Sequence, residues 1–431
     1  MPDTLPSFSH RLVVIGGGAA GFFCAVNAAR MAPGLEVILL EKTSKLLSKV
    51  SVSGGGRCNL THACFDRDEL IKNYPRGMHF VRKAFHQFFT KDTVEWFEAR
   101  GVALKTEQDG RMFPASNRSE TIVQCLRAEA ARYGVRVMTN AAVTAIHPIP
   151  AVDEASGRKQ ARFRLAVAGA ALHSLPDELE CDFVCVACGG FAKPAMFSWL
   201  QELGHSFEPP LPSLFTFNLP KHPITALMGV SVPDVLVKIA GTKWSMQGPL
   251  LITHWGCSGP AILKLSAWAA RDLAALDYHF TAVVNWLPSF NEHSLRFAFD
   301  QHRKELAPQK IGNKNPFGLP ARLWEFFLGA QNIKDDTRWA DLKASAQNAL
   351  IKMLCAMELP VTGKTTFKEE FVTAGGIRLS EIDPSTMMSR KLDGLYFAGE
   401  IMDVDGVTGG FNFQHAWTSG FIVAKSVVRS L

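Results

Sequence analysis

The sequence predicts an α/β fold built on a parallel sheet, with a second domain inserted into the chain. Three observations predict it: a strand–helix–strand unit near the N-terminus, a glycine-rich strand–turn–helix near the C-terminus, and, between them, a stretch with short strand-like runs followed by amphipathic helices. Residues 12–42 form the first unit, with the pattern G-x-G-x-x-G at Gly16, Gly18 and Gly21 between two apolar strands. Glycines in this βαβ context are the fingerprint of Rossmann-like dinucleotide-binding domains.

Each position of the fingerprint has a mechanical reason. Gly16 permits a tight turn, Gly18 lets the backbone approach a pyrophosphate, and Gly21 lets helix and strand pack closely. The first helical turn, at Ala19 and Ala20, offers backbone N–H groups to the phosphates. The alternative is an ordinary glycine-containing turn, because the glycine pattern without its context is weak.

The second strand of this unit ends on Glu41, twenty residues after Gly21. A carboxylate at this tip can accept hydrogen bonds from both hydroxyls of an adenosine ribose, and it disfavours a 2′-phosphate. Lys42 follows it directly, and we include it in the predicted cofactor site.

A second phosphate-facing loop is predicted in residues 392–428. The strand LYFAGE stops at the loop, and an apolar helix follows a turn rich in glycine and aspartate. An extended FAD needs donors for its ribityl chain and isoalloxazine ring as well as for its adenosine half, so two such loops favour FAD over NAD. The alternative is a surface turn before a C-terminal helix. The predicted contacts from this loop are Gly399, Glu400, Asp405, Gly409, Gly410, Phe411 and Asn412.

A third glycine cluster lies in residues 49–62. Gly54, Gly55 and Gly56 can form a concave nest of N–H groups for an anion, and Arg57 adds a cation beside it. Asn59 can hydrogen-bond flavin or phosphate, so we include it in the cofactor site with Cys58. Cys58 is either a thiol activated by Arg57 or, as we favour, a small packed side chain.

Four segments, 53–62, 109–126, 251–266 and 372–417, resemble the YhiN/BaiN-like family of bacterial flavoproteins. Its members are often labelled "aminoacetone oxidase family FAD-binding enzyme". The resemblance implies a two-dinucleotide-binding-type flavoprotein fold with an inserted domain and one FAD. One branch of the family is associated with reductive steps on bile-acid intermediates.

The chain departs from that branch after the strand at 182–190. Related members follow it with two glycine-rich stretches, whereas here Gly189, Gly190 and Pro194 are kept and the second threonine- and glycine-rich loop is absent. We retain Gly189 in the predicted cofactor site. The chain therefore resembles a distinct subgroup, whose substrate does not follow from the branch.

The predicted domains are a discontinuous FAD-binding domain, residues 1–192 and 361–431, and an inserted substrate or cap domain, residues 193–360. Short strand-like runs predict a β-barrel or sandwich over about 193–290, and amphipathic helices are expected over about 291–360. Within the first domain, apolar spacing predicts one helix over 80–100. Strands at 142–149 and 161–170 are expected to pair as a hairpin across the polar turn 152–160.

Composition fits a large cytoplasmic enzyme. The chain has 431 residues, 47% of them hydrophobic and 20% charged, without an apolar run long enough for a bilayer span. Its nine cysteines suit a reducing cytosol. Cys181, Cys185 and Cys188 have an iron–sulfur-like spacing but lie on a predicted strand, so we expect buried strand residues and no metal site. A net charge of +6 without a basic tract weighs against a nucleic-acid partner.

His254, in a glycine-containing turn after an apolar strand, is the candidate catalytic acid or base. The alternative is a histidine that fixes the turn, and His415 is better explained by packing. Arg57 and Arg111 are candidates to hold a carboxylate substrate or to bind phosphate or a main-chain carbonyl.

We expect an FAD-dependent oxidoreductase that transfers hydride or electrons between flavin and an unidentified small molecule, with NAD(P)H a candidate transient donor. The alternatives are a flavoprotein that acts on RNA, or a non-catalytic FAD-binding interaction protein. The sequence does not distinguish an oxidase from a reductase, and it does not give the oligomeric state.

Overall fold

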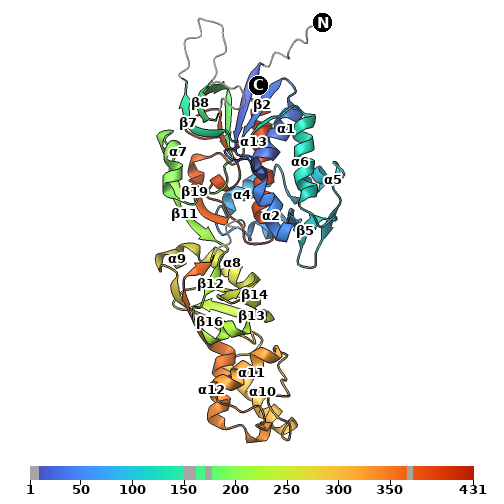
Figure 1. Ribbon diagram of the computed structural model, residues 1–431, viewed down its shortest axis with the longest axis vertical. Coiled ribbons are helices and arrows are strands. Elements are labelled where there is room, and N and C mark those ends of the chain that lie inside the picture. The colour runs from blue at the N-terminus through green and yellow to red at the C-terminus, as the bar shows by residue number, and fades with distance from the viewer. Residues whose placement is uncertain (1–8, 150–161, 170–176, 366–371) are drawn as a thin grey trace. The chain divides into compact units, whose positions relative to one another are not determined.

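The computed structural model describes residues 9–149, 162–169, 177–365 and 372–431 (Figure 1). The chain forms two compact units, residues 1–212 with 368–431, and residues 213–367. The first boundary thus falls after residue 212, whereas the sequence put it after 192. The reason is a two-stranded sheet in which β11 (Phe207–Ser213) pairs with β19 (Val372–Ile377), which ties residues 193–212 to the first unit.

The first unit is built on a five-stranded sheet in the order β20-β10-β1-β2-β6, whose neighbouring strands all run parallel. The central strands are continuous apolar runs, as expected of strands covered on both faces. Because the strands are parallel, the loops after them meet at one edge of the sheet. The strands are β1 (His10–Ile15), β2 (Leu35–Leu40), β6 (Arg136–Met138), β10 (Phe183–Val186) and β20 (Leu395–Phe397).

Two helices from opposite ends of the chain pack against each other beside this sheet, α1 (Ala19–Met31) and α13 (Phe411–Arg429) (Figure 1). Gly420 makes their close crossing possible, because a Cβ there would lie 2.6 Å from the Ala20 carbonyl oxygen. Phe23 of α1 and Trp417 of α13 lie side by side, with ring centroids 5.3 Å apart. The C-terminal helix is therefore part of the core of the first unit.

Smaller elements surround this core. The predicted hairpin is present as β7 paired antiparallel with β8, and its turn, 152–160, lies outside the described residues. A separate three-stranded sheet has the order β3-β5-β4. These strands are β3 (Thr61–His62), β4 (Leu104–Thr106), β5 (Arg111–Pro114), β7 (Ala142–Pro148), β8 (Phe163–Ala168) and β9 (Glu178–Cys181), and the remaining helices of four or more residues in this unit are α2 (Ser48–Gly56), α3 (Arg67–Ile71), α4 (Met78–Ala84), α5 (Thr90–Glu98), α6 (Glu120–Arg132), η3 (Pro194–Phe197) and α7 (Ser198–Glu202).

The prediction of one helix over 80–100 is wrong, because α4 and α5 are separate. The Phe89 backbone N–H donates to the Asp92 carboxylate at 2.7 Å, which caps a new helix at that point. Phe85, Phe88 and Phe89 are all buried in the break between the helices. Apolar spacing alone did not reveal this, since the aromatic residues of the break continue the apolar pattern.

The second unit contains a seven-stranded antiparallel sheet in the order β17-β16-β13-β14-β15-β12-β18. Its two outermost strands are consecutive in the chain and separated by Gly363 alone. The Gly363 N–H donates to the Tyr278 carbonyl (2.9 Å), and its carbonyl accepts from the Asn218 N–H (3.1 Å). The sheet therefore curls until both edges meet in one bent strand. The strands are β12 (Thr216–Asn218), β13 (Ser231–Ile239), β14 (Ser245–Ile252), β15 (Gly256–Ser258), β16 (His279–Asn285), β17 (Met357–Thr362) and β18 (Lys364–Thr365).

Helices share one continuous apolar core with this sheet. Trp286, Trp324 and Trp339 are almost fully buried in it and join the sheet to the helices between residues 291 and 356. This confirms the predicted α/β class with a curved antiparallel sheet and a helical part in the second unit. The helices of five or more residues are η4 (Pro223–Leu227), α8 (Pro260–Trp268), α9 (Ala270–Ala275), α10 (Glu292–Glu305), α11 (Ala321–Ala330) and α12 (Ala344–Ala356). Within the described ranges, no helix has the length and apolarity to cross a membrane.

Candidate cofactor site

Three loops meet at the carboxyl edge of the parallel sheet, after β1, β10 and β20. A Cβ on Gly16 would lie 2.4 Å from the Ala187 carbonyl oxygen, so the loops after β1 and β10 are in contact. A Cβ on Gly399 would lie 2.9 Å from the Ala20 side chain, so the loop after β20 reaches the first turn of α1. Glycines predicted from opposite ends of the chain thus form one edge, as the rule for ligand sites in parallel sheets requires.

The fingerprint glycines have three different environments. Gly16 has φ +116°, a conformation that glycine adopts readily. At Gly21 a Cβ would lie 1.9 Å from the Gly16 carbonyl oxygen, so helix and turn are in direct contact there. At Gly18 a Cβ would meet nothing within 4 Å. This open position is where a ligand can approach the backbone.

The N-terminus of α1 has backbone N–H groups that suit an anion. Its N-cap, Gly18, supplies no side-chain oxygen to the first-turn N–H groups of Ala19 and Ala20. Glu41 lies beside this turn, where its carboxylate accepts from the Gly17 N–H (2.9 Å) and from Thr43 (2.9 Å). Its oxygens have lone pairs beyond these bonds. Lys42 is exposed next to it.

The loop after β20 is fixed by Glu400. This carboxylate pairs with Lys49 (2.5 Å) and accepts from the Thr373 backbone N–H (2.9 Å). It therefore links the loop to α2 and to β19. Gly189 lies close by, with φ +74° and the position of its Cβ 3.9 Å from Glu400 Oε2.

Asp405, a predicted cofactor contact, pairs with Arg76 in this structure. It is fully buried and forms a bidentate ion pair with Arg76, which is also buried. The guanidinium occupies both carboxylate oxygens, so in this structure the pair anchors the loop before α13. Arg76 was not singled out from the sequence, because nothing local marks an arginine as the partner of a residue so far along the chain.

Phe411 and Asn412 also hold the loop before α13 in place. The Asn412 amide exchanges two hydrogen bonds with the backbone of Gly406, both of 2.8 Å. Phe411 stacks on His62, with ring centroids 4.7 Å apart, and His62 Nδ1 lies 3.0 Å from the Gly409 carbonyl oxygen. His62 belongs to segment 53–62, one of the four that carry the family resemblance, but its role depends on this tertiary contact.

The third glycine cluster forms the end of α2. Gly54, Gly55 and Gly56 all have positive φ, from +59° to +80°, and a Cβ on Gly55 or Gly56 would meet no atom within 4 Å. Arg57, next to them, pairs with Glu107 at 2.6 Å and lies over the Phe113 ring. The backbone here is accessible, while the guanidinium is engaged within the protein.

Arg111 pairs with the same carboxylate, Glu107, at 3.1 Å and with Asp109 at 2.7 Å. Arg57 and Arg111 are therefore joined through one acid. Of the roles expected for these arginines, contact with a main-chain carbonyl is seen for Arg57, whose Nε donates to the Gly54 carbonyl (3.3 Å), while both guanidinium groups pair with acids of the chain.

Cys58 is fully buried, and burial raises the pKa of its thiol to about 12. A thiol with such a pKa is not activated at neutral pH, so the packed role that we favoured fits the structure. Asn59 is buried beside it. In the amide orientation that satisfies both ends, it donates to the Thr61 carbonyl (3.2 Å) and accepts from the Gly410 N–H (2.9 Å). Asn59 thus joins the glycine cluster to the start of α13.

Two buried side chains near this edge have polar atoms without hydrogen-bond partners among the described residues. One is His415, one turn into α13, through both of its ring nitrogens, and the other is Thr373, through its hydroxyl. Buried polar atoms without partners are rare in proteins and mark positions where a ligand or water completes the site. With the open backbone at Gly18 and the uncapped helix α1, the residues present fit a dinucleotide such as FAD.

His415 also gives a pH prediction. Burial lowers its pKa from 6.5 to about 4, so the folded cofactor-free protein keeps it neutral while the unfolded chain takes up a proton near pH 6.5. The stability that the protein gains by keeping His415 neutral is fully present above pH 6.5, and it is lost as the pH falls toward 4. Between about pH 7.5 and pH 5, the wild type should lose about 2 kcal/mol of unfolding free energy more than H415L. Urea titrations at both pH values measure this, and equal losses would contradict it.

Comparison with known proteins identifies the family. Residues 10–426 match the family described as HI0933-like protein Rossmann domain. The chain belongs to this family. The match spans nearly the whole sequence and confirms the YhiN/BaiN-like resemblance seen in four separate segments.

The relatives of this HI0933-like chain carry names of two kinds, one for an enzyme that acts on a bile acid and one for an enzyme that acts on ribosomal RNA. It is 28% identical to a 3-dehydro-bile acid delta(4,6)-reductase of Clostridium scindens, over 97% of this chain and 99% of that protein. It is 29% identical to a ribosomal RNA dihydrouridine synthase of Escherichia coli, over 97% and 98%. Among solved structures, the open conformation of a flavocytochrome c3 fumarate reductase aligns with a TM-score of 0.50 and 16% identity, over 98% of this chain and 79% of the other. That likeness reflects the fold alone.

His254 lies in the second unit, at the exposed tip of the hairpin between β14 and β15. The turn is closed by Thr253, whose N–H donates to the Gly256 carbonyl at 2.8 Å, and His254 contacts the Trp255 ring edge-on. Its catalytic role stays a prediction. In the part of the chain that the structure describes, no group of three or more His, Cys, Asp or Glu side chains could hold a metal ion.

Proposed function

We propose that this protein is an FAD-dependent oxidoreductase that reduces a carbon–carbon double bond conjugated to a carbonyl group. The observation that carries this proposal is the dinucleotide cradle at the carboxyl edge of the sheet, with an open backbone at Gly18 and unpartnered polar groups at His415 and Thr373. FAD, when bound, supplies hydride transfer. The chain's own part is to hold the dinucleotide by backbone N–H groups and to position the substrate.

The names of the relatives support the choice of bond. A delta(4,6)-reductase acts on double bonds conjugated to the 3-ketone of a 3-dehydro-bile acid, and a dihydrouridine synthase forms the reduced uracil ring. In both, the bond that is reduced is conjugated to a carbonyl. In the overall reaction one hydride and one proton add across that bond, and the electron pair comes from reduced flavin.

A uracil ring within RNA is the substrate that we favour. Residues 213–367 contain sixteen lysines and arginines against eleven aspartates and glutamates, whereas the rest of the chain contains thirty against twenty-nine. Nearly all the positive excess is thus concentrated in the second unit, where it suits a polyanion. The modest charge of the whole chain had weighed against nucleic acid. Exposed lysines of this unit include Lys243, Lys304, Lys310, Lys314, Lys334, Lys343 and Lys352.

A small-molecule enone is the second candidate. It is favoured by the similarity to the bile-acid reductase, which extends over 99% of that protein. The two candidates differ in what they demand of the charge on the second unit, because an enone has no phosphate backbone.

The test uses purified protein reduced with dithionite without oxygen. It is mixed with ribosomal RNA lacking the modification or with a 3-keto-4-ene steroid, and flavin re-oxidation is followed. RNA should re-oxidise the flavin and yield a uridine heavier by two hydrogen atoms in nuclease digests. Steroid turnover alone would select the second candidate, and no bound flavin or no turnover of either compound would refute the proposal.

A charge-reversal pair separates the candidates further. Lys304→Glu with Lys310→Glu should lower RNA turnover about tenfold or more at low salt, because phosphate contacts dominate nucleic-acid affinity. The matched control, Lys72→Glu with Lys91→Glu, makes the same charge change on exposed lysines of the first unit. Equal effects of both pairs would contradict a specific role of the second unit.

A further inference from the structure

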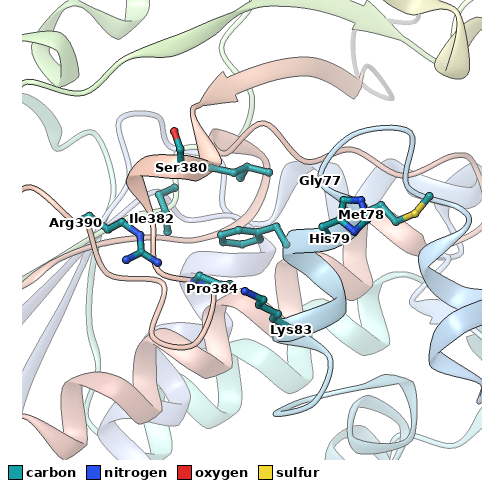
Figure 2. A pocket seen from close by; sticks show the side chains of 10 residues that line it. Gly77, Met78, His79, Lys83, Ser380, Ile382, Pro384 and Arg390 are labelled. Carbon is teal, nitrogen blue, oxygen red and sulfur yellow. The ribbon is translucent and has the colours of Figure 1, made fainter.

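A pocket of about 590 Å³ in the first unit lies between α4 and the segment around the short helix η6 (Leu379–Glu381). Figure 2 shows its two walls, with Lys83 on α4 and Arg390 on the opposite segment. Its volume is within the range of small-molecule sites, and it is a surface hollow that is broadly open to solvent. One of its walls belongs to segment 372–417, which carries part of the family resemblance, while the G-x-G-x-x-G fingerprint lies outside it.

One part of the pocket is apolar. Phe80 and Ile382 are buried, and Leu379 and Pro384 are partly buried beside them. Such a surface suits one face of a planar ring, since aromatic and aliphatic side chains line most ligand sites.

The other part is cationic. His79, Lys83 and Arg390 line the pocket and are all exposed. In Figure 2 the Lys83 ammonium and the Arg390 guanidinium lie on either side of Pro384. Arg390 pairs loosely with Asp383, 3.6 Å away, and about half of its side chain is exposed, so its N–H donors are accessible to a ligand. Guanidinium and ammonium groups beside an apolar surface are recognition elements for phosphate on a ring-bearing ligand.

The pocket adjoins the cofactor loop. Gly77 lines the pocket, and a Cβ on it would lie 2.6 Å from the Val404 side chain and 3.3 Å from the Asp403 carbonyl oxygen. The next residue back, Arg76, holds Asp405 in the same loop. One short segment therefore contacts both the pocket and the loop that leads to Gly409 and Gly410.

We propose that this pocket binds the dihydronicotinamide dinucleotide that supplies the electrons. The inference rests on the proposed function, since a reductase needs a donor. NADH or NADPH loses one hydride and becomes NAD⁺ or NADP⁺. FAD, when bound, would accept that hydride with one proton and would pass two electrons and two protons to the conjugated carbon–carbon double bond, which becomes a single bond. The ring packs on Leu379 and Pro384, beside the largely buried Phe80, and the phosphates contact Lys83 and Arg390.

The first test is equilibrium binding, which requires no turnover. Oxidised NADP⁺ and NAD⁺ are titrated by calorimetry into flavin-loaded wild type and into K83A/R390A. The double variant should bind the nucleotide that wild type prefers about tenfold or more weakly, because two charge-assisted contacts are lost. Lys91→Ala, an exposed lysine of α5 outside the pocket, is the matched control and should bind like wild type.

Ser380→Trp provides a second variant, because it adds a bulky side chain at an exposed position of the rim without removing a charge. Both variants should need more NAD(P)H for half-maximal flavin reduction, while dithionite reduces their flavin as in wild type. Normal nucleotide binding in both variants, no binding by wild type, or a loss of RNA binding instead would overturn the inference. The proposed function fails differently, since dithionite-reduced protein would then leave every conjugated double bond unreduced.

Discussion

Gly18→Ala is expected to weaken FAD binding by about tenfold or more while leaving the cofactor-free fold intact. A Cβ at this position would meet no protein atom within 4 Å, and its backbone angles, φ −91° and ψ −169°, are open to alanine. The added methyl would instead occupy the space of the pyrophosphate. Flavin fluorescence titration measures the affinity, and thermal unfolding of the cofactor-free protein measures the fold.

Substitutions at two further glycines serve as controls for this result. Gly21→Ala should lower the free energy of unfolding by about 3 kcal/mol, because its Cβ would lie 1.9 Å from the Gly16 carbonyl oxygen and backbone cannot easily move away. Gly34→Ala, in the same strand–helix–strand unit with no atom near its Cβ, should change neither property. Unchanged FAD affinity in Gly18→Ala would mean that the dinucleotide does not lie on this turn.

Asp405→Asn should destabilise the protein by about 3 to 5 kcal/mol, because it leaves the buried Arg76 guanidinium without its counter-charge. Both side chains are at most 8% exposed, so water cannot replace the lost partner. Bound flavin should fall as well, since this pair anchors the loop before α13. Urea unfolding and the ratio of flavin to protein absorbance measure the two effects.

The matched control is Asp68→Asn, which breaks an exposed pair with Arg82 and should have no measurable effect. The double variant R76M/D405L removes both buried charges and should recover part of the stability, because no isolated charge remains. If Asp405→Asn were as stable as wild type, the pair would not anchor the loop.

The residues that could be predicted from sequence are those with a local physical reason. The turn at Gly16, the close packing at Gly21 and the open backbone at Gly18 follow from conformational freedom and from the absence of a Cβ. The strands β1 and β2 were equally readable, since they are short apolar runs between clear turns. Their function as a cofactor cradle stays a prediction that the Gly18 variant tests.

The expectations that the sequence left open concern polar groups with several possible partners. Arg57 and Arg111 were candidates for a substrate carboxylate, a phosphate or a main-chain carbonyl; in the structure both pair with Glu107, and Arg57 also donates to the Gly54 carbonyl. A charged side chain in a sequence shows what it can bind, whereas packing decides which of several possible partners it meets.

The sequence by itself determined the family, the α/β class and the glycine positions, because these depend on local geometry and on order along the chain. Only the tertiary structure decided that Asp405 belongs to Arg76, 329 residues earlier, and that Gly399 faces the first turn of α1. It also gave the limits of the unit in which the positive charge is concentrated. These features arise when α13 packs on α1 and β20 joins the edge of the parallel sheet, which brings together residues that no local rule connects.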